Sequence, residues 1–249
     1  MRGIGSAPPG VDRGHVSTEL HSRKTAAVEV QNLHYSIGDR RLLDGLTLNV
    51  PAGSSVAVTG PSGSGKTTLL CCLSGLISPS SGVVRVGGVD ITQASAGERA
   101  ALRLRTVGTV YQFGELIPEL SPLENAALPV LLAGGSAKGA YADAQRLLDE
   151  LGVQGASSKT TGALSGGERQ RVAVARALIG KPSVVLADEP TGSLDQRTGD
   201  VVADLLFGLP ARFGCALIVV THNPQIADRA DRALELAEGR LIADSGEAR

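Results

Sequence analysis

One segment limits the folds open to this chain more than any other, the glycine-rich run Gly60-Pro61-Ser62-Gly63-Ser64-Gly65-Lys66-Thr67. The β-branched residues 54–59 before it predict a short strand, and the apolar residues 67–76 after it predict a helix. Glycines in a loop between a strand and a helix let backbone N–H groups surround a phosphate at the positive end of the helix. The spacing G-x4-G-K-T therefore predicts a phosphate-binding loop for a nucleotide.

Two side chains of this loop have chemistry of their own. Lys66 can reach the β- and γ-phosphates of a nucleoside triphosphate, and the Thr67 hydroxyl can bind Mg²⁺. We assign every residue from Gly60 to Thr68 to nucleotide binding. A Gly/Ser-rich loop can match the pattern by accident, but the flanking strand and helix favour the functional interpretation. The loop alone leaves kinases, GTPases and motor ATPases open.

The rest of the pattern predicts an α/β core with a helical arm. Strands, the last of them a hairpin turning at Glu238-Gly239, are predicted at residues 28–35, 42–50, 54–59, 83–86, 184–187, 216–220 and 233–243. From about residue 94 to residue 178 the pattern is helical. One apolar stripe in this region is formed by Ala140, Ala144, Leu147, Leu148 and Leu151.

Two acids follow the apolar run of residues 184–187 directly. Ligands of a parallel sheet gather at the carboxyl ends of its strands, so Asp188 and Glu189 are expected to face the phosphate-binding loop. Asp188 would hold Mg²⁺, and Glu189 would polarise the attacking water. A single acid at a strand end is common and needs no function. Asp-Glu-Pro behind four apolar residues, beside a phosphate-binding loop, favours a catalytic pair.

A second segment of small residues, Leu164-Ser165-Gly166-Gly167-Glu168, also has the pattern of an anion site. The helix predicted to begin near Gly166 has an apolar stripe made of Val172, Ala175 and Ile179. Ser165 and two glycine N–H groups would then lie at its positive end, although an ordinary serine cap would explain Ser-Gly-Gly alone. Because one loop already encloses one nucleotide's phosphates, we interpret the second segment as completing a site on another copy.

Together these residues resemble the ATP-binding cassette (ABC) family. The matching elements, in the family's order, are the phosphate-binding loop, Gln112, residues 164–170, residues 184–190, Ser193-Leu194-Asp195 and His222. The resemblance spans roughly residues 27–246. It implies an α/β fold with a P-loop NTPase (RecA-like) core, an antiparallel β subdomain and an inserted α-helical subdomain. The implied core covers about residues 27–112 and 180–246, and the helical subdomain about residues 113–179.

The resemblance also implies roles for single residues. Tyr35 is similar to the aromatic residue that stacks on adenine, and Asp195 to the aspartate of a loop at the dimer interface. Gln112 would contact Mg²⁺ and water, together with the metal ligands Thr67 and Asp188, and His222 would contact the γ-phosphate. The implied catalytic residues are Lys66, Gln112, Glu189 and His222. The implied nucleotide ligands supplied across the dimer are Ser165, Gly166, Gly167, Glu168 and Asp195. Taken singly, several of these residues have plainer explanations: Tyr35 could be an ordinary strand aromatic, and His222 could cap the end of a strand.

Residues 103–112, 116–125 and 190–195 resemble the MacB/LolD branch of the family. Two positions differ from that branch, because Phe113 follows Gln112 directly and Ser193 replaces an asparagine. The resemblance implies an ATP-hydrolysing energy subunit with ATP and Mg²⁺ as cofactors. It further implies a homodimer around two ATP molecules, a separate membrane permease as partner and a place on the cytoplasmic face of the membrane.

Two alternatives remain open from the sequence. The chain could be an ATP-gated regulator of a membrane complex, as in the similar cell-division ATPases, with little transport. It could also act on DNA or ribosomes, but such ABC proteins usually carry coiled-coil or zinc insertions or two tandem cassettes. With a net charge of −1, no nucleic-acid partner is expected.

The N-terminal residues and the longest apolar run indicate how the chain relates to the membrane. Residues 1–26 are rich in small and polar residues and lack the apolar core of a signal peptide, so a disordered tail is predicted. The longest apolar run, residues 126–133, contains Pro129 and is too short to span a membrane. Any membrane-spanning part is therefore expected in another chain.

Overall fold

The computed structural model describes residues 26–155 and 159–243. The predicted tail lies outside the described residues, apart from Ala26. The strands are β1 Ala26–Ile37, β2 Arg40–Pro51, β3 Ser55–Thr59, β4 Ser81–Val86, β5 Val89–Asp90, β6 Val107–Val110, β7 Val184–Asp188, β8 Ala216–Val220, β9 Arg232–Ala237 and β10 Arg240–Ala243. The helices are α1 Lys66–Leu73, α2 Ala96–Thr106, α3 Pro122–Leu132, α4 Ala137–Glu150, the 3₁₀ helix η2 Thr161–Ala163, α5 Gly166–Leu178, α6 Gln196–Phe213 and α7 Pro224–Ala227.

The described strands form two sheets. The larger has the order β10-β9-β3-β8-β7-β6, and its members are parallel except for β10, which closes the predicted hairpin with β9. The smaller is antiparallel and has the order β2-β1-β4-β5. The structure therefore confirms the α/β class with an antiparallel β layer beside a mainly parallel sheet.

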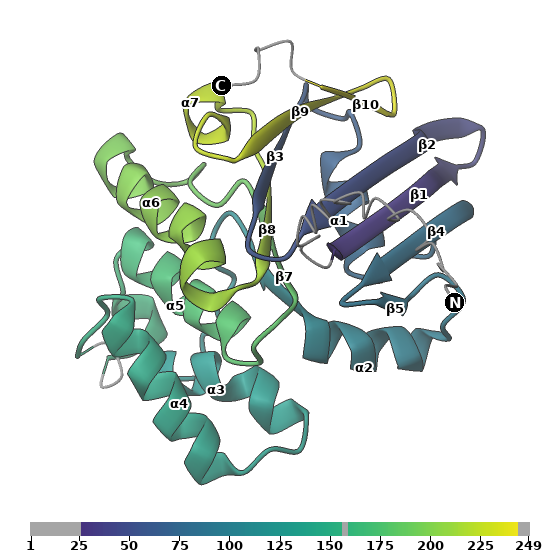
Figure 1. Ribbon diagram of the computed structural model, residues 1–249. Helices are drawn as coiled ribbons and strands as arrows, with labels where there is room; N and C mark the ends of the chain where they lie inside the picture. Colours follow the sequence, from purple (N-terminus) through teal and green to yellow (C-terminus); the bar gives the residue numbers. More distant parts are fainter. Residues whose placement is uncertain (1–25, 156–158, 244–249) are drawn as a thin grey trace, which may run out of the picture.

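Helices cover both faces of the larger sheet, and Figure 1 shows α1 on one side with α5 and α6 on the other. The strands are apolar throughout because alternate residues serve two cores. On β7, Val184 and Leu186 belong to the core that includes α1. Val185 and Ala187 belong to the core that includes α5 and α6. This explains why residues 184–187 and 216–220 are continuous apolar runs.

The helical arm consists of α3 and α4 packed together and against α5 (Figure 1). The stripe predicted on α4 faces this contact, since Ala140, Ala144 and Leu148 are fully or almost fully buried. Two capping boxes fix helix starts in this part of the chain, at Ser121 for α3 and at Ser165 for α5.

The helical pattern predicted from about residue 94 to residue 178 misses a strand, and residues 111–121 and 151–155 are not helical either. Residues 107–110 form β6, which pairs in parallel with β7 at the edge of the larger sheet. A strand of this length shows no clear periodicity, so its pairing with β7 decides its structure. Helix α1 also ends earlier than predicted, at Leu73.

Gly108 in β6 is expected to tolerate no side chain. A Cβ atom there would lie 2.3 Å from the carbonyl oxygen of Ala177 in α5. We expect Gly108→Ala to lower the free energy of unfolding by about 1–3 kcal/mol, because the backbones must move apart. Gly139→Ala on α4 is the matched control, since the nearest atom is 3.9 Å away. That change should raise stability by up to ~1 kcal/mol. Chemical denaturation measures both; equal stabilities of the two variants would contradict this packing.

Candidate nucleotide-binding and catalytic site

The loop between β3 and α1 is shaped by close backbone approaches. Gly60 has a φ of 141°, and a Cβ there would lie only 2.4 Å from the carbonyl oxygen of Leu236. Gly65 precedes α1 with a φ of 104°, in the left-handed region that favours glycine. The loop can hold this shape only with glycine at these positions.

The loop has donors available for a phosphate. Lys66 donates hydrogen bonds from Nζ to the carbonyl oxygens of Gly60 and Pro61, at 2.8 and 2.9 Å. An ammonium group has three donors, so one remains. The Ser64 hydroxyl oxygen is buried without a hydrogen-bond partner among the described residues. An unpartnered buried hydroxyl at a helix N-terminus fits an anionic ligand such as the phosphates of ATP.

Thr67 and Asp188 meet at the carboxyl edge of the larger sheet. The Thr67 hydroxyl donates to Oδ2 of Asp188 at 3.0 Å. Burial raises the pKa of Asp188, and the hydrogen bond from Thr67 lowers it in part. A hydroxyl and a carboxylate are oxygen donors of the kind that Mg²⁺ prefers, so these two side chains fit a magnesium ion.

The chain turns sharply at Glu189, directly after β7. Its φ is 45°, which is unusual for a residue other than glycine. Its amide donates to the carbonyl oxygen of Val220, which holds the turn against β8. The carboxylate accepts from the Thr221 hydroxyl at 3.2 Å and lies 2.7 Å from Nδ1 of His222. The two predicted catalytic residues, Glu189 and His222, are therefore in direct contact.

This contact fixes the histidine's role. An ionised carboxylate can only accept, so Nδ1 of His222 carries the proton in the pair. Nε2 is then left for a second partner. The His222 side chain is 71% exposed while that of Glu189 is 19% exposed, so the histidine lies between the half-buried carboxylate and solvent.

Gln112 follows β6 and lies against the loop that leaves Glu189. Its carbonyl oxygen accepts from the Ser193 hydroxyl at 2.7 Å. The side-chain nitrogen Nε2 of Gln112 lies 2.9 Å from the position that a Cβ atom on Gly192 would occupy. Among the described residues, no hydrogen bond joins Gln112 to Thr67 or Asp188. The structure thus brings Gln112 near the acid pair through residues 190–193.

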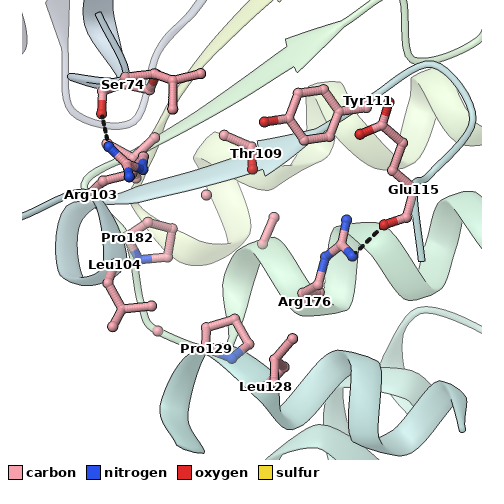
Figure 2. A pocket seen from close by; sticks show the side chains of 15 residues that line it. Ser74, Arg103, Leu104, Thr109, Tyr111, Glu115, Leu128, Pro129, Arg176 and Pro182 are labelled. Carbon is pink, nitrogen blue, oxygen red and sulfur yellow. Dashed lines mark hydrogen bonds between the residues drawn. The ribbon is translucent and has the colours of Figure 1, made fainter. Parts of the chain in front are cut away.

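Two side chains of α5 hold the chain on either side of Gln112. The sequence assigned no role to Gln170, although it belongs to the matched residues 164–170, and did not single out Arg176. Gln170 is buried and donates to the carbonyl oxygens of Tyr111 and Pro190, at 2.7 and 2.6 Å. Arg176 donates to those of Gly114 and Glu115, at 2.8 and 2.7 Å. Figure 2 shows this arginine beside a hollow of about 320 Å³ at β6, α3 and α5.

A sequence signal for both residues did exist. Gln170 interrupts the buried face of α5, and Arg176 stands within the apolar run of residues 172–179. Burial lowers the pKa of the Arg176 guanidinium. A buried polar side chain needs partners, so each of these residues could have been marked as binding distant backbone.

Ser165 caps α5 as predicted. Its hydroxyl accepts from the amide of Glu168 at 3.2 Å, and the Glu168 carboxylate accepts from the amide of Ser165 at 2.8 Å. A hydrogen bond from Lys159 is the first cause that lowers the pKa of Glu168 to about 2. Glu168 is therefore ionised at neutral pH and is held within its own chain.

The glycines of this cap pack against the start of α6. A Cβ on Gly166 would lie 2.9 Å from Leu194, and one on Gly167 would lie 2.6 Å from Thr198. Asp195 is the N-cap of α6 and accepts from the amide of Thr198 at 3.0 Å. The cap of α5 and the predicted interface loop, residues 193–195, thus form one surface.

Tyr35 lies apart from these groups. It is half-buried on β1, opposite Leu43 of β2, and packs against the core beneath the antiparallel sheet. It does not line either of the hollows beside the phosphate-binding loop.

A phosphate-binding loop whose lysine and threonine lie at the edge of a parallel sheet, beside an Asp-Glu pair, defines a P-loop nucleoside triphosphatase. The sequence profile described as ABC transporter matches residues 43–192. The chain belongs to the ABC transporter family, as its sequence predicted.

Named relatives agree with this result. The chain is 48% identical over 207 residues to the lipoprotein-releasing system ATP-binding protein LolD of Chromohalobacter salexigens, which covers 83% of this chain and 87% of the relative. It is 46% identical over 202 residues to LolD of Legionella pneumophila strain Paris, covering 81% and 89%. The resemblance to the MacB/LolD branch is confirmed.

A solved structure has the same fold. The dimeric ATP-binding cassette MJ0796, in a post-hydrolysis state bound to ADP and phosphate, superposes with a TM-score of 0.78 at 32% identity, covering 89% of this chain and 99% of that chain. The present chain is an ABC-type ATPase that binds ATP. No helix within residues 26–155 and 159–243 is long and apolar enough to cross a membrane.

Proposed function

We propose that this chain is the energy subunit of a MacB/LolD-type system, in which two copies bind two ATP molecules between them and drive a separate membrane permease. It works at the cytoplasmic face of the membrane, attached through that permease. The relatives named for a lipoprotein-releasing system support this branch. The observation that carries the proposal is the contact of the phosphate-binding loop with the acid pair at the end of β7, which His222 joins from the end of β8.

The chemistry follows from that junction. Lys66, with the backbone from Gly60 to Thr68, holds the phosphates of ATP. Thr67, Asp188 and Gln112 hold Mg²⁺, which neutralises phosphate charge. Glu189 accepts a proton from the attacking water as a general base. His222 holds the Glu189 carboxylate through Nδ1 and offers Nε2 toward the γ-phosphate.

Two copies are needed because one chain keeps its two anion sites apart. The phosphate-binding loop leads into α1, on one face of the larger sheet, and Ser165 begins α5 on the other face (Figure 1). Ser165, Gly166, Gly167 and Glu168 therefore complete the site of a second copy, and Asp195 lies at the same surface. Tyr35 supplies the adenine platform, since stacking needs a flat aromatic face.

The test of this function uses a membrane permease of the MacB/LolD type that is co-expressed with this chain. We expect the two to co-purify, and we expect ATP hydrolysis to rise when the permease is present in nanodiscs with its cargo. If the complex forms but cargo leaves hydrolysis unchanged, the chain is the ATP-gated regulator instead. If no membrane protein co-purifies and nucleic acid stimulates hydrolysis, the proposal is wrong.

A further inference from the structure

Arg40 lies beside the phosphate-binding loop although it belongs to the antiparallel sheet. It is the first residue of β2, directly after the turn that joins β1 to β2. Its Nη2 donates to the carbonyl oxygen of Gly63 at 3.4 Å, across the gap between the sheet and the loop. This long contact is the only hydrogen bond of the guanidinium among the described residues. Most of its five donors are therefore free.

The space beside this guanidinium is suited to an anion. A hollow of about 260 Å³ is lined by Arg40, Leu42, Gly63, Gly65, Lys66, Thr67 and Thr68. Two of these residues are cations, and no carboxylate is among them. Arg40 also forms no ion pair within the described residues. Its charge is thus turned toward the loop and is not neutralised by the protein.

Arg41, the next residue, differs from Arg40 because it forms an ion pair. Arg41 binds Oδ1 of Asp44 at 2.9 Å. Arg41 is held by Asp44 and lines a second hollow together with Arg40 and residues 61–64, but it does not line the hollow that Arg40 shares with Lys66 and Thr68. The pair therefore offers a matched comparison at equal charge and equal size.

We infer that Arg40 is a nucleotide ligand that binds the α- and β-phosphates, which ATP and ADP share. The inference rests on the proposed ATP site. Backbone N–H groups at the start of α1 surround the α- and β-phosphates in loops of this type, while the lysine reaches the β- and γ-phosphates. The hollow includes Thr67 and Thr68 of the first turn of α1 beside Lys66, so the anion that it would take is the α- and β-phosphate part that the start of the helix surrounds. A guanidinium binds phosphate through two parallel hydrogen bonds.

The assignment of Arg40 to the α- and β-phosphates also affects the binding of the product, ADP. A ligand of the shared phosphates stabilises bound ADP as much as bound ATP, so it adds affinity without distinguishing the two. It also joins the nucleotide to the hairpin that carries Tyr35, at the opposite end of the same turn. Arg40 thus adds affinity for the diphosphate unit and none for the third phosphate.

The test measures dissociation constants of fluorescent ATP and ADP analogues for the full chain. We expect Arg40→Ala to weaken both by about tenfold and by the same factor, the loss of one charge-assisted phosphate contact. Arg40→Lys should recover part of the affinity, and Arg41→Ala should bind as the unaltered chain does. Circular dichroism verifies that each variant is folded.

The measured affinities distinguish failure of this inference from failure of the proposed function. Unaltered affinity of Arg40→Ala, in a preparation whose unaltered chain binds both nucleotides, overturns this inference and leaves the proposed function intact. A loss for ATP but not for ADP assigns the guanidinium to the γ-phosphate and also overturns it. If the unaltered chain binds neither nucleotide, the proposed function fails and the inference fails with it.

Discussion

Glu189→Gln lowers the rate of ATP hydrolysis by at least about 100-fold, the usual contribution of a positioned general base. Glutamine has the same shape and can still accept from the Thr221 hydroxyl, which holds Glu189 at 3.2 Å. It cannot take a proton from water. ATP therefore binds but is not consumed, and the ATP-bound dimer accumulates. Release of phosphate, measured over minutes at saturating ATP, gives the rate.

The control is Glu119→Gln, which makes the same change at an exposed residue outside the site. Its rate should equal that of the unaltered chain. Hydrolysis by Glu189→Gln at the unaltered rate would show that the carboxylate at the end of β7 is not the base. The position of His222, 2.7 Å from this carboxylate, would then need another explanation.

Lys66→Ala is expected to lower ATP affinity by at least about tenfold and hydrolysis by more than 100-fold. The ammonium group holds two carbonyl oxygens of the loop and is placed for the β- and γ-phosphates. Alanine removes a charge-assisted contact that strengthens in the transition state, so hydrolysis suffers more than binding. Isothermal titration and phosphate release measure the two effects separately.

The matched control for this change is Lys138→Ala, at an exposed residue of α4. It should leave both affinity and rate unchanged. The hydrogen bonds of Lys66 lie within its own loop, so the variant should fold, which thermal unfolding verifies. Unchanged ATP affinity of Lys66→Ala would contradict the assignment of Gly60 to Thr68 as the nucleotide site.

Parts of this site could be predicted because their residues are close in the sequence. The phosphate-binding loop, the Asp188-Glu189 pair and the Ser165 cap each lie within one local element. Their chemistry depends on a strand end or a helix start, which local patterns mark well. The structure confirms these elements, and the family relation is confirmed with them. The roles assigned to single residues remain predictions for the experiments above.

Other parts depend on residues that meet only in the folded chain. Gln170 contacts a carbonyl group 59 residues away, and Arg176 reaches one 61 residues away. Arg40 reaches Gly63 across the gap between two sheets. Strand β6 exists because it pairs with β7, and no local pattern distinguishes it from the helical residues around it. Such contacts require the register of the sheets, which the sequence alone does not supply.

The most direct test of the account is the molar mass of Glu189→Gln in solution with ATP and Mg²⁺, measured by light scattering after gel filtration. The central claim is that the phosphate-binding loop of one copy and Ser165 of another enclose the same ATP. We predict twice the 25.4 kDa of one chain with ATP, one ATP bound per chain, and a single chain without nucleotide. A particle that keeps the mass of one chain at saturating ATP would contradict the claim.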